Sequence, residues 1–460
     1  MNGRTFDVAV IGGGPAGLSA ATAARRCGAS VILIDAFEQG GGQYCMQPLA
    51  FGKPSAQTDL GRRLIAEAEL HGVEALYGHE VIAAYPGFRL LTTGRTGGAA
   101  VAARAIVAAT GAHDRVAAFP GWTLPGVMTA GAGQRLAKVH GVLPGARIVL
   151  AGSGIFLWAV ALSLLERGAV ITALVEARRP QAAMFGHLAA YPERWAEAWT
   201  LFRAVSRNVP RIVWGQLVAA AGGTAHVDKV SIRPVGGGPA ETIVGIDALL
   251  VGHGFQPNID VTSLLDCRHA FDESLGGWHA TADADGRTSV PGVYGAGEVT
   301  GVSGARPALL SGEIAGLCAA RDLGYRVPGG GGRLALLRWR LRRARRFGRG
   351  LGRIFAPLPE LADVPDNETI LCRCEEVSRA EILAACRDGA RHMHTLKTWT
   401  RAGMGHCQGR MCRMSIAACA TAALGLEGRE LGYNKARVPL RPVNLERLLA
   451  VLDAEEESRT

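Results

Sequence analysis

The stretch FDVAVIGGGPAGLSAATAARRCGASVILID, residues 6–35, decides the fold of this chain. Its apolar ends predict two buried strands, and the run of small residues between them predicts a helix. Gly12, Gly14 and Gly17 stand where the first strand turns into the helix, a spacing that lets the backbone turn tightly and approach a pyrophosphate. Asp35 ends the second strand, where an acid accepts hydrogen bonds from ribose hydroxyls. The stretch therefore predicts a dinucleotide-binding Rossmann unit.

A second stretch, ARIVLAGSGIFLWAVALSLLERGAVITALVE at residues 146–176, repeats this plan. Two such units in one chain predict two Rossmann-like domains. The second unit keeps Gly152 and Gly154, but Leu157 stands where a third glycine or an alanine would let helix and strand pack closely. A leucine there is expected to push the helix away from the strand or to block a bound dinucleotide. The domain is predicted to be degenerate, and whether it binds NAD(P)H, another adenine nucleotide or nothing stays open.

The length, the net charge and the cysteine pattern of the chain narrow the class of protein. A length of 460 residues suggests two or three domains. The net charge is +10, but nine arginines and no acid lie between residues 333 and 353, so the rest of the chain is nearly neutral. This distribution argues against a nucleic-acid partner. The uncharged run at 148–165 is interrupted by a glycine turn and is interpreted as a strand and a helix, not a membrane span. With no visible signal peptide and no disulfide pattern, a cytoplasmic protein is expected.

Two late stretches, ILCRCEEVSR (370–379) and RAGMGHCQGRMC (401–412), hold four cysteines: Cys372, Cys374, Cys407 and Cys412. Four thiolates bind zinc or an iron–sulfur cluster. Cys-x-Cys is tight for a zinc knuckle, whereas the two irons of a [2Fe–2S] cluster each take two cysteines, so the pairs need not be alike. Cys412 also precedes a predicted helix, whose N-terminus favours a thiolate. These features favour [2Fe–2S], and zinc or an empty site remain as alternatives.

Three further motifs, GGGQY (40–44), IVAATGA (106–112) and PGVYGAGEVT (291–300), complete a resemblance to the two-dinucleotide-domain flavoproteins, the class of thioredoxin reductase. The resemblance covers about residues 1–325, and Glu298 replaces the aspartate usual in that family. It implies bound FAD. The residues implied to lie near FAD are Gly12, Gly14, Pro15, Ala16, Gly17, Asp35, Gly42, Gln43, Val81, Thr110, Gly111, Gly297 and Glu298.

The cysteine segment resembles the bacterioferritin-associated ferredoxin type of [2Fe–2S] domain. With FPGWTLPGVMTAGAGQ (119–134) and GHGFQPNIDVTSLLDC (252–267), the whole chain resembles the FAD-containing α subunit of heteromeric, dye-linked amino-acid dehydrogenases, the type of opine oxidase, D-hydroxyproline dehydrogenase and hydrogen cyanide synthase. This implies a flavoprotein β subunit that oxidises an opine, hydroxyproline, glycine or a sarcosine-like amine, with room for a small ferredoxin-like subunit. The chain itself would relay electrons to a respiratory acceptor and would hold no catalytic residue for the amine.

The predicted fold class is α/β, with two Rossmann-like domains and a small helical [2Fe–2S] domain. The expected boundaries are 1–118 with 256–326 for the FAD domain, 119–255 for the degenerate domain, 327–366 for a linker with the basic helix, 367–430 for the [2Fe–2S] domain and 431–460 for a tail. The basic helix is either a solvated linker or a docking face for an acidic subunit or an anionic membrane, which allows only peripheral membrane association. Two other functions are alternatives: a self-sufficient NAD(P)H-dependent FAD/[2Fe–2S] reductase, and a scaffold whose cluster is only structural.

Overall fold

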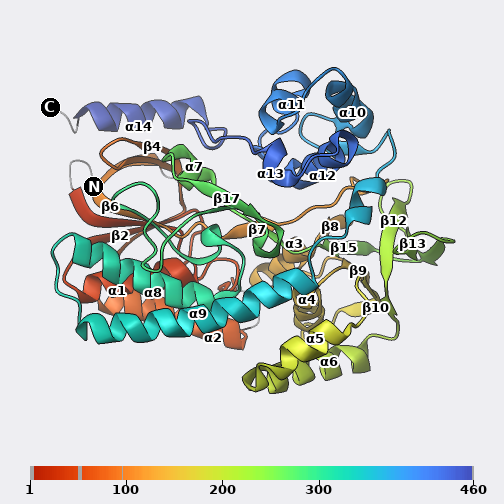
Figure 1. Cartoon of the computed structure of the whole chain (residues 1–460), viewed down its shortest axis with the longest axis horizontal. Helices are drawn as coiled ribbons and strands as arrows, with labels where there is room; N and C mark the ends of the chain where they lie inside the picture. The colour runs from red at the N-terminus through yellow and green to blue at the C-terminus, as the bar shows by residue number, and fades with distance from the viewer. Residues whose placement is uncertain (1–4, 50–53, 96, 458–460) are drawn as a thin grey trace.

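The computed structural model describes residues 5–49, 54–95 and 97–457 of the chain. Figure 1 shows two sheet-containing domains side by side, with the helices of the C-terminal part above them. The predicted architecture of two Rossmann-like units followed by a helical C-terminal part is confirmed. Across the described ranges, no helix combines the length and the apolar character that a membrane crossing requires.

The first domain is built on a seven-stranded sheet of order β3-β2-β1-β6-β5-β4, with β19 paired to β6. Five strands run parallel, whereas β4 and β5 add an antiparallel hairpin to β6. Strand β2 is buried along its whole length, as its continuous apolar sequence predicts. The strands are β1 (Thr5–Ile11), β2 (Val31–Asp35), β3 (Glu74–Tyr77), β4 (His79–Tyr85), β5 (Arg89–Gly94), β6 (Gly97–Ala108) and β19 (Val293–Gly295).

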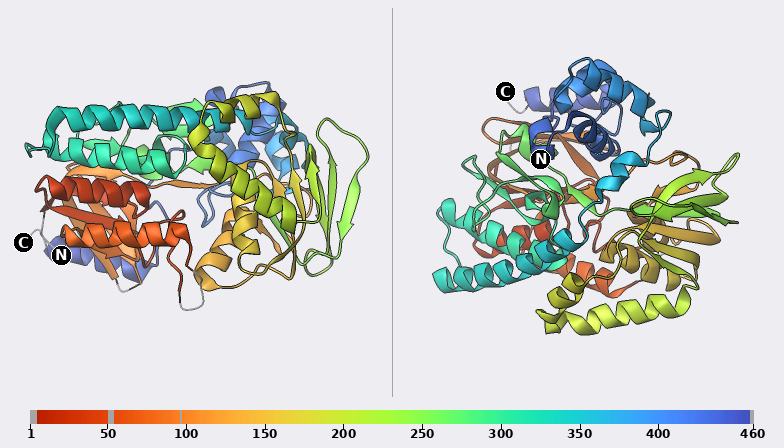
Figure 2. Two further views of the ribbon diagram at one scale, coloured as in Figure 1. Left: turned by 90° about the horizontal axis from the view of Figure 1, so that it is seen from below. Right: turned by 45° about the vertical axis from the view of Figure 1, so that its right-hand side comes forward.

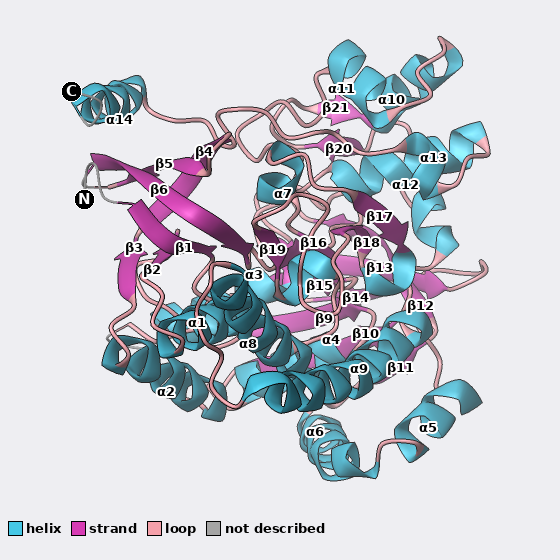
Figure 3. Ribbon diagram, turned by 60° about the vertical axis from the view of Figure 1, so that its left-hand side comes forward, coloured by secondary structure: helices cyan, strands magenta, loops and turns pink. Residues whose placement is uncertain are grey.

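Helices α1 (Pro15–Arg26) and α8 (Ala305–Asp322) pack against each other beside this sheet, as Figure 3 shows. The contact is close because small residues face each other. A Cβ on Gly312 or Gly316 of α8 would collide with the backbone of Ala16 or Ala20 on α1. Helix α2 (Ala56–Leu70) covers α1 and begins at Ser55, whose hydroxyl accepts a hydrogen bond from the Thr58 N–H.

The second domain has a parallel sheet of order β11-β10-β9-β15-β8 and a separate antiparallel sheet, β12-β13-β14. The uncharged run at 148–165 forms β9 and α4, as predicted. The strands are β8 (Val127–Thr129), β9 (Arg147–Gly152), β10 (Val170–Glu176), β11 (Ile212–Trp214), β12 (Gln216–Gly222), β13 (Lys229–Pro234), β14 (Glu241–Val244) and β15 (Ala248–Gly252). The helices are α3 (Ala130–Arg135), the π-helical turn η1 (Leu136–His140), α4 (Ile155–Leu165), α5 (Ala182–Ala189), η2 (Pro192–Arg194) and α6 (Trp195–Asn208).

A two-stranded ribbon carries the chain out of the first domain and back into it. Strand β7 (Ala112–Asp114) pairs antiparallel with β16 (Phe255–Pro257), and His113 lies opposite Gln256. The returning chain then forms the small elements that lead back to β19. These are α7 (Asp260–Leu264), β17 (His269–Asp272), η3 (Glu273–Leu275) and β18 (Gly277–Ala280), followed after β19 by η4 (Gly297–Thr300).

The C-terminal part packs on both domains. Its apolar residues, among them Leu371 and Ile416, share one core with Trp122 and Val218 of the second domain. The last helix returns to the first sheet, where Val451 is fully buried. The elements are η5 (Pro359–Asp363), β20 (Ile370–Cys372), β21 (Val377–Ser378), α10 (Arg379–Arg387), α11 (Met393–Thr400), α12 (Arg413–Leu424), α13 (Gly428–Leu431) and α14 (Leu445–Glu457).

The arginine-rich segment forms α9 (Gly330–Ile354), which is more than a solvated linker. Leu334, Leu337 and Leu341 are buried in the core beside α8, and Figure 2 shows the two helices side by side. Further along, the ring of Phe347 stacks on His187 of α5 at 5.2 Å between ring centres. The helix therefore contacts both Rossmann-like domains.

Candidate functional site

The first glycine turn leaves no room for side chains. Gly12 has φ +106°, and a Cβ there would collide with the carbonyl oxygen of Ala109. A Cβ on Gly17 would collide with the carbonyl oxygen of Gly12. Gly14 precedes α1, and Gly42 lies so close to it that a Cβ on Gly42 would be 2.8 Å from the Gly14 Cα. The turn, the start of α1 and the loop at 40–44 thus form one cradle.

Asp35 lies at the end of β2 behind this turn and is buried. Its carboxylate accepts hydrogen bonds from the N–H groups of Gly13 and Phe37, the latter at 2.7 Å. Burial raises the pKa of Asp35, and these two backbone donors and Arg135 partly offset that effect. The aspartate therefore braces the glycine turn.

The other residues that the first resemblance places near FAD belong to several different segments of the first domain. Gln43 is exposed beside Gly42, and the Thr110 hydroxyl donates to the Asn258 carbonyl at 2.6 Å. Pro15 and Ala16 are buried in the first turn of α1, and Gly111 accepts from the Asn258 N–H. Val81 belongs to an apolar core cluster with Ile11 and Ile34, so its side chain packs inside the domain.

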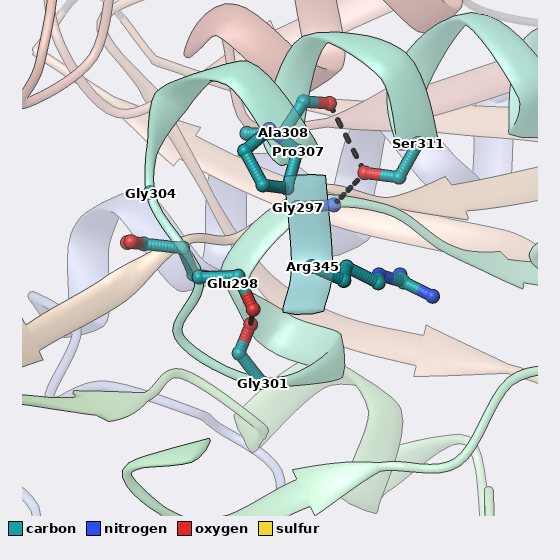
Figure 4. Close-up of a pocket in the computed structure, with 9 residues that line it drawn as sticks. Gly297, Glu298, Gly301, Gly304, Pro307, Ala308, Ser311 and Arg345 are labelled. Carbon is teal, nitrogen blue, oxygen red and sulfur yellow. Dashed lines mark hydrogen bonds between the residues drawn. The ribbon is translucent and has the colours of Figure 1, made fainter. Parts of the chain in front are cut away.

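The second predicted motif meets the first across α1 and α8. A Cβ on Gly297 would lie 2.8 Å from the Cβ of Ala16. Figure 4 shows how Ser311 fixes this point: its hydroxyl accepts from the Gly297 N–H at 2.9 Å and donates to the Ala308 carbonyl at 3.1 Å. Glu298 lines the pocket beside them, and burial raises the pKa of Glu298 to about 7, with the Gly304 N–H acting in the opposite direction.

Sequence reasoning missed two side chains here. Arg345 lines the same pocket, and its Nη2 donates to the Thr300 hydroxyl at 3.0 Å. Ser311 was also missed, because a serine inside a small-residue helix carries no signal of its own. Arg345 was hidden among nine similar arginines, and only its helical phase, four residues beyond the buried Leu341, marks it as facing inward.

A buried lysine on the π-helical turn η1 was missed as well. Lys138 hydrogen-bonds to Gln57, and burial with the nearby Arg167 lowers the pKa of Lys138 to about 8. Cys45, at the end of the loop of the first cradle, is fully buried near this amine, and burial raises its pKa to about 11. A π-helical turn often marks a functional position, and this signal was not readable from the sequence.

The second glycine turn is covered by the chain itself. The Phe355 ring, just beyond α9, would lie 3.6 Å from a Cβ on Gly154. Arg178 fixes this segment by donating to the Ala356 carbonyl at 2.6 Å. Leu157 is buried in the domain core, with its side chain toward Gly252 of β15, and α4 begins at Ile155. That this leucine pushes the helix away from the strand or blocks a dinucleotide stays a prediction. Phe355 is the residue that occupies the approach to the turn.

The four predicted cysteines come together although 32 residues separate the two motifs. The Cys412 thiol donates to Cys372, and Cys374 hydrogen-bonds with Cys407, so each pair takes one residue from each motif. Within the described ranges, no group of three or more His, Cys, Asp or Glu side chains is arranged around a single metal-ion position. The thiols thus face one another as two pairs.

Backbone N–H groups point at one of these sulfurs. Cys372 Sγ accepts from the Gly403 N–H at 3.5 Å and also from the N–H groups of Glu375 and Cys374. The hydrogen bond from Cys412 and these backbone donors lower the pKa of Cys372 to about 6, and the same hydrogen bond raises the pKa of Cys412. The surroundings of Cys372 therefore suit a thiolate.

One arginine connects the cysteine loop to the first domain. Arg410 lies between Cys407 and Cys412 in sequence, and its Nε donates to His113 Nε2 at 3.2 Å. Its Nη2 contacts Asp260 at 2.7 Å, and Gln256 donates to its carbonyl at 2.8 Å. Burial lowers the pKa of His113 to about 4, so this imidazole is neutral and accepts from Arg410.

Comparison with known proteins agrees with this architecture. Residues 6–316 match the family described as pyridine nucleotide-disulphide oxidoreductase, and residues 367–452 match the sarcosine oxidase A3 domain. An opine oxidase subunit of Agrobacterium tumefaciens is 32% identical over 96% of this chain and 91% of that protein. The hydrogen cyanide synthase subunit HcnB of Pseudomonas protegens is 30% identical over 95% of this chain and 96% of that protein.

The fold has a solved counterpart. The crystal structure of L-proline dehydrogenase from P. horikoshii matches with a TM-score of 0.72 at 19% identity, over 97% of this chain and 79% of that one. The match over the whole chain includes the C-terminal part as well as both Rossmann-like units. This chain therefore belongs to the pyridine nucleotide-disulphide oxidoreductase family, as an FAD-dependent oxidoreductase of the group that contains the opine oxidase and hydrogen cyanide synthase subunits.

Proposed function

We propose that this chain is the electron-transferring subunit of a heteromeric amino-acid oxidoreductase. It carries FAD in the first domain and a [2Fe–2S] cluster at the four cysteines, and it passes electrons from an amine-oxidising flavoprotein subunit to a respiratory acceptor. The observation that carries the proposal is the meeting of four thiols in two pairs beside a flavoprotein fold. The names of the relatives, each a subunit of an oxidase or synthase, support the heteromeric assembly.

The residues of the first cradle fit FAD. The Gly12 and Gly17 positions admit only glycine, and the start of α1 presents free N–H groups where a pyrophosphate would lie. Asp35 braces that turn, and Gly297 brings the second motif against Ala16. Glu298 takes the place of the aspartate of related motifs, and it lines the same pocket as Gly297 and Gly304. These residues would hold the pyrophosphate, ribose and ribityl chain.

The residues of the cysteine site fit a [2Fe–2S] cluster. A two-iron cluster takes two thiolates at each iron, and the thiols of this chain face each other in twos. N–H groups aimed at Cys372 Sγ would stabilise negative charge on the sulfur, and Cys412 stands at the N-terminus of α12. When bound, FAD accepts electrons in pairs and such a cluster passes them on singly. Arg410 would hold the two cofactor regions at a fixed separation.

The proposed substrate class is taken from the names of the relatives, which are opine oxidase and hydrogen cyanide synthase subunits. An opine, hydroxyproline, glycine or a sarcosine-like amine would be oxidised by the partner subunit. The alternative, a self-sufficient NAD(P)H-dependent reductase, needs an accessible second glycine turn, and Phe355 lies over that turn. The scaffold alternative leaves the thiol pairs without a redox role.

The test is anaerobic reduction of the complex purified from the native host through a tag on this chain. We expect iron and labile sulfide in equal amounts, flavin bleaching and an EPR signal of the reduced cluster when one of these amines is added. NADH and NADPH should leave the spectrum unchanged. Cys374→Ser should abolish the EPR signal, whereas Cys386→Ser, a buried cysteine in α10, should keep it.

Reduction of the isolated chain by NADPH would contradict the relay. A cluster that stays oxidised throughout amine turnover would favour the scaffold. Iron absent from anaerobically purified protein would remove the cluster from the proposal and leave the flavin part to stand alone.

A further inference from the structure

Helix α6 presents a stripe of aromatic side chains to solvent. Trp195, Trp199 and Phe202 follow one another at helical spacing, and they are 52%, 61% and 46% exposed. Val205 is the single side chain of α6 that is fully enclosed. Figure 1 shows α5 and α6 at the outer edge of the second domain. Contiguous exposed aromatics of this kind mark a surface that another molecule covers.

The stripe is fixed in place. The indole N–H of Trp195 donates to the Leu188 carbonyl of α5 at 2.8 Å. Phe202 stacks on Trp158 of α4 at 5.7 Å between ring centres. Because these side chains are already ordered, a partner that covers them loses little conformational entropy on binding.

The charges around the stripe are positive. Glu193 and Glu197 are paired with Arg343 and Arg194, so these acids add no free negative charge. Arg203 and Arg207 are exposed on α6, and neither has an ion-pair partner within the described part of the chain. A matching surface therefore has an apolar recess rimmed by carboxylates.

We propose that the face of α6 formed by Trp195, Trp199, Phe202, Arg203 and Arg207 is the docking surface for the partner flavoprotein subunit. This inference rests on the proposed function, which supplies the partner. The partner surface would be an apolar recess with an acidic rim.

The experiment compares full-length complexes carrying wild-type chain, Trp199→Glu, or the pair Arg203→Glu and Arg207→Glu. Val244→Glu is the control, because Val244 is 71% exposed and lies on strand β14, outside α6. Partner retention is measured by light scattering and flavin content, and hydrogen–deuterium exchange is recorded for the chain alone and in the complex. FAD content and the thermal melting temperature verify that each variant is folded.

We expect α6 to be protected from exchange only in the complex. Trp199→Glu should weaken partner binding about 30-fold or more, the loss typical of a central aromatic residue. The double arginine variant should weaken binding at low salt and remove most of the salt dependence. The control should bind like wild type.

Several results would overturn the inference. One is a partner that binds Trp199→Glu as tightly as wild type with α6 unprotected. Protection of α6 in the isolated chain by self-association would assign the face to a second copy, and protection only by vesicles of anionic phospholipid would assign it to a membrane. If no amine-oxidising flavoprotein accompanies even the wild-type chain, the proposed function itself fails, and this outcome is distinct from the others.

Discussion

Arg410 Nη2 lies 2.7 Å from Asp260 Oδ2, and both side chains are only 13% exposed where the cysteine loop meets the first domain. Asp260 also accepts from Arg413 at 3.4 Å and from Arg441 at 3.3 Å. One carboxylate therefore compensates three guanidinium groups, with help from Glu80 on Arg441. Removing a single negative charge here would leave several buried positive charges uncompensated.

Asp260→Asn should destabilise the chain by about 3 kcal/mol or more, because breaking a buried ion network leaves unpaired charge. Urea unfolding followed by circular dichroism measures the change. Asp266→Asn is the control, since its pair with Lys435 is exposed and should contribute less than about 1 kcal/mol. Equal effects of the two substitutions would show that the network adds little.

Gly405→Ala should disturb the cysteine site without unfolding the chain. A Cβ at this position would collide with the Cβ of Cys374. We expect iron content per chain to fall at least several-fold while FAD content stays unchanged. Gly186→Ala on α5, where a Cβ meets open space, should leave both unchanged. Full iron content in the first variant would contradict the close approach.

Glu298 should make the stability of the FAD-free chain depend on pH. Burial raises the pKa of Glu298 to about 7, so the folded chain holds this proton more tightly than the unfolded chain does. The stabilisation is complete below the ordinary pKa of a glutamate, near 4.3, and is lost as the pH rises through about 7. Thermal melts of wild type should therefore decline from pH 5 to 8.5 more steeply than those of Glu298→Gln. Parallel curves would show that the carboxyl is solvated.

Gly352→Ala should weaken the hold of α9 on the first domain. Alanine favours helix over glycine by up to about 1 kcal/mol, but a Cβ here would collide with the Ser274 carbonyl. We expect a lower melting temperature and faster proteolysis after α9. Gly332→Ala lies in the first turn of the same helix, where a Cβ meets open space, and should be neutral or stabilising. A stabilised Gly352→Ala would contradict the contact.

Much of the fold was predictable because the signals are local. The glycine turn at Gly12 and the acid at Asp35 lie within one stretch, and their spacing already encodes the strand, turn and helix. The pairing of Cys372 with Cys412 was not encoded in either motif, because it depends on how two distant loops fold together.

The contact between Phe355 and the second glycine turn could not be predicted from the sequence either. Phe355 lies about 200 residues after Gly154, and the sequence around Phe355 does not predict that its side chain packs beside this glycine. The sequence indicated a degenerate domain through Leu157, which is buried in the core, and gave no sign of Phe355. Long-range packing of this kind is decided by the shape of two surfaces, which periodicity does not report.

The three glycines at the end of α9 have a mechanical consequence. Gly348 and Gly352 abut Ser303 and Ser274 of the first domain, while Gly350 abuts His187 of the second. Because α9 is in close contact with both Rossmann-like domains, we expect it to prevent the two domains from moving relative to each other during turnover. If this chain relays electrons as proposed, the separation of its cofactors would be set at folding, and the transfer rate should be insensitive to solvent viscosity.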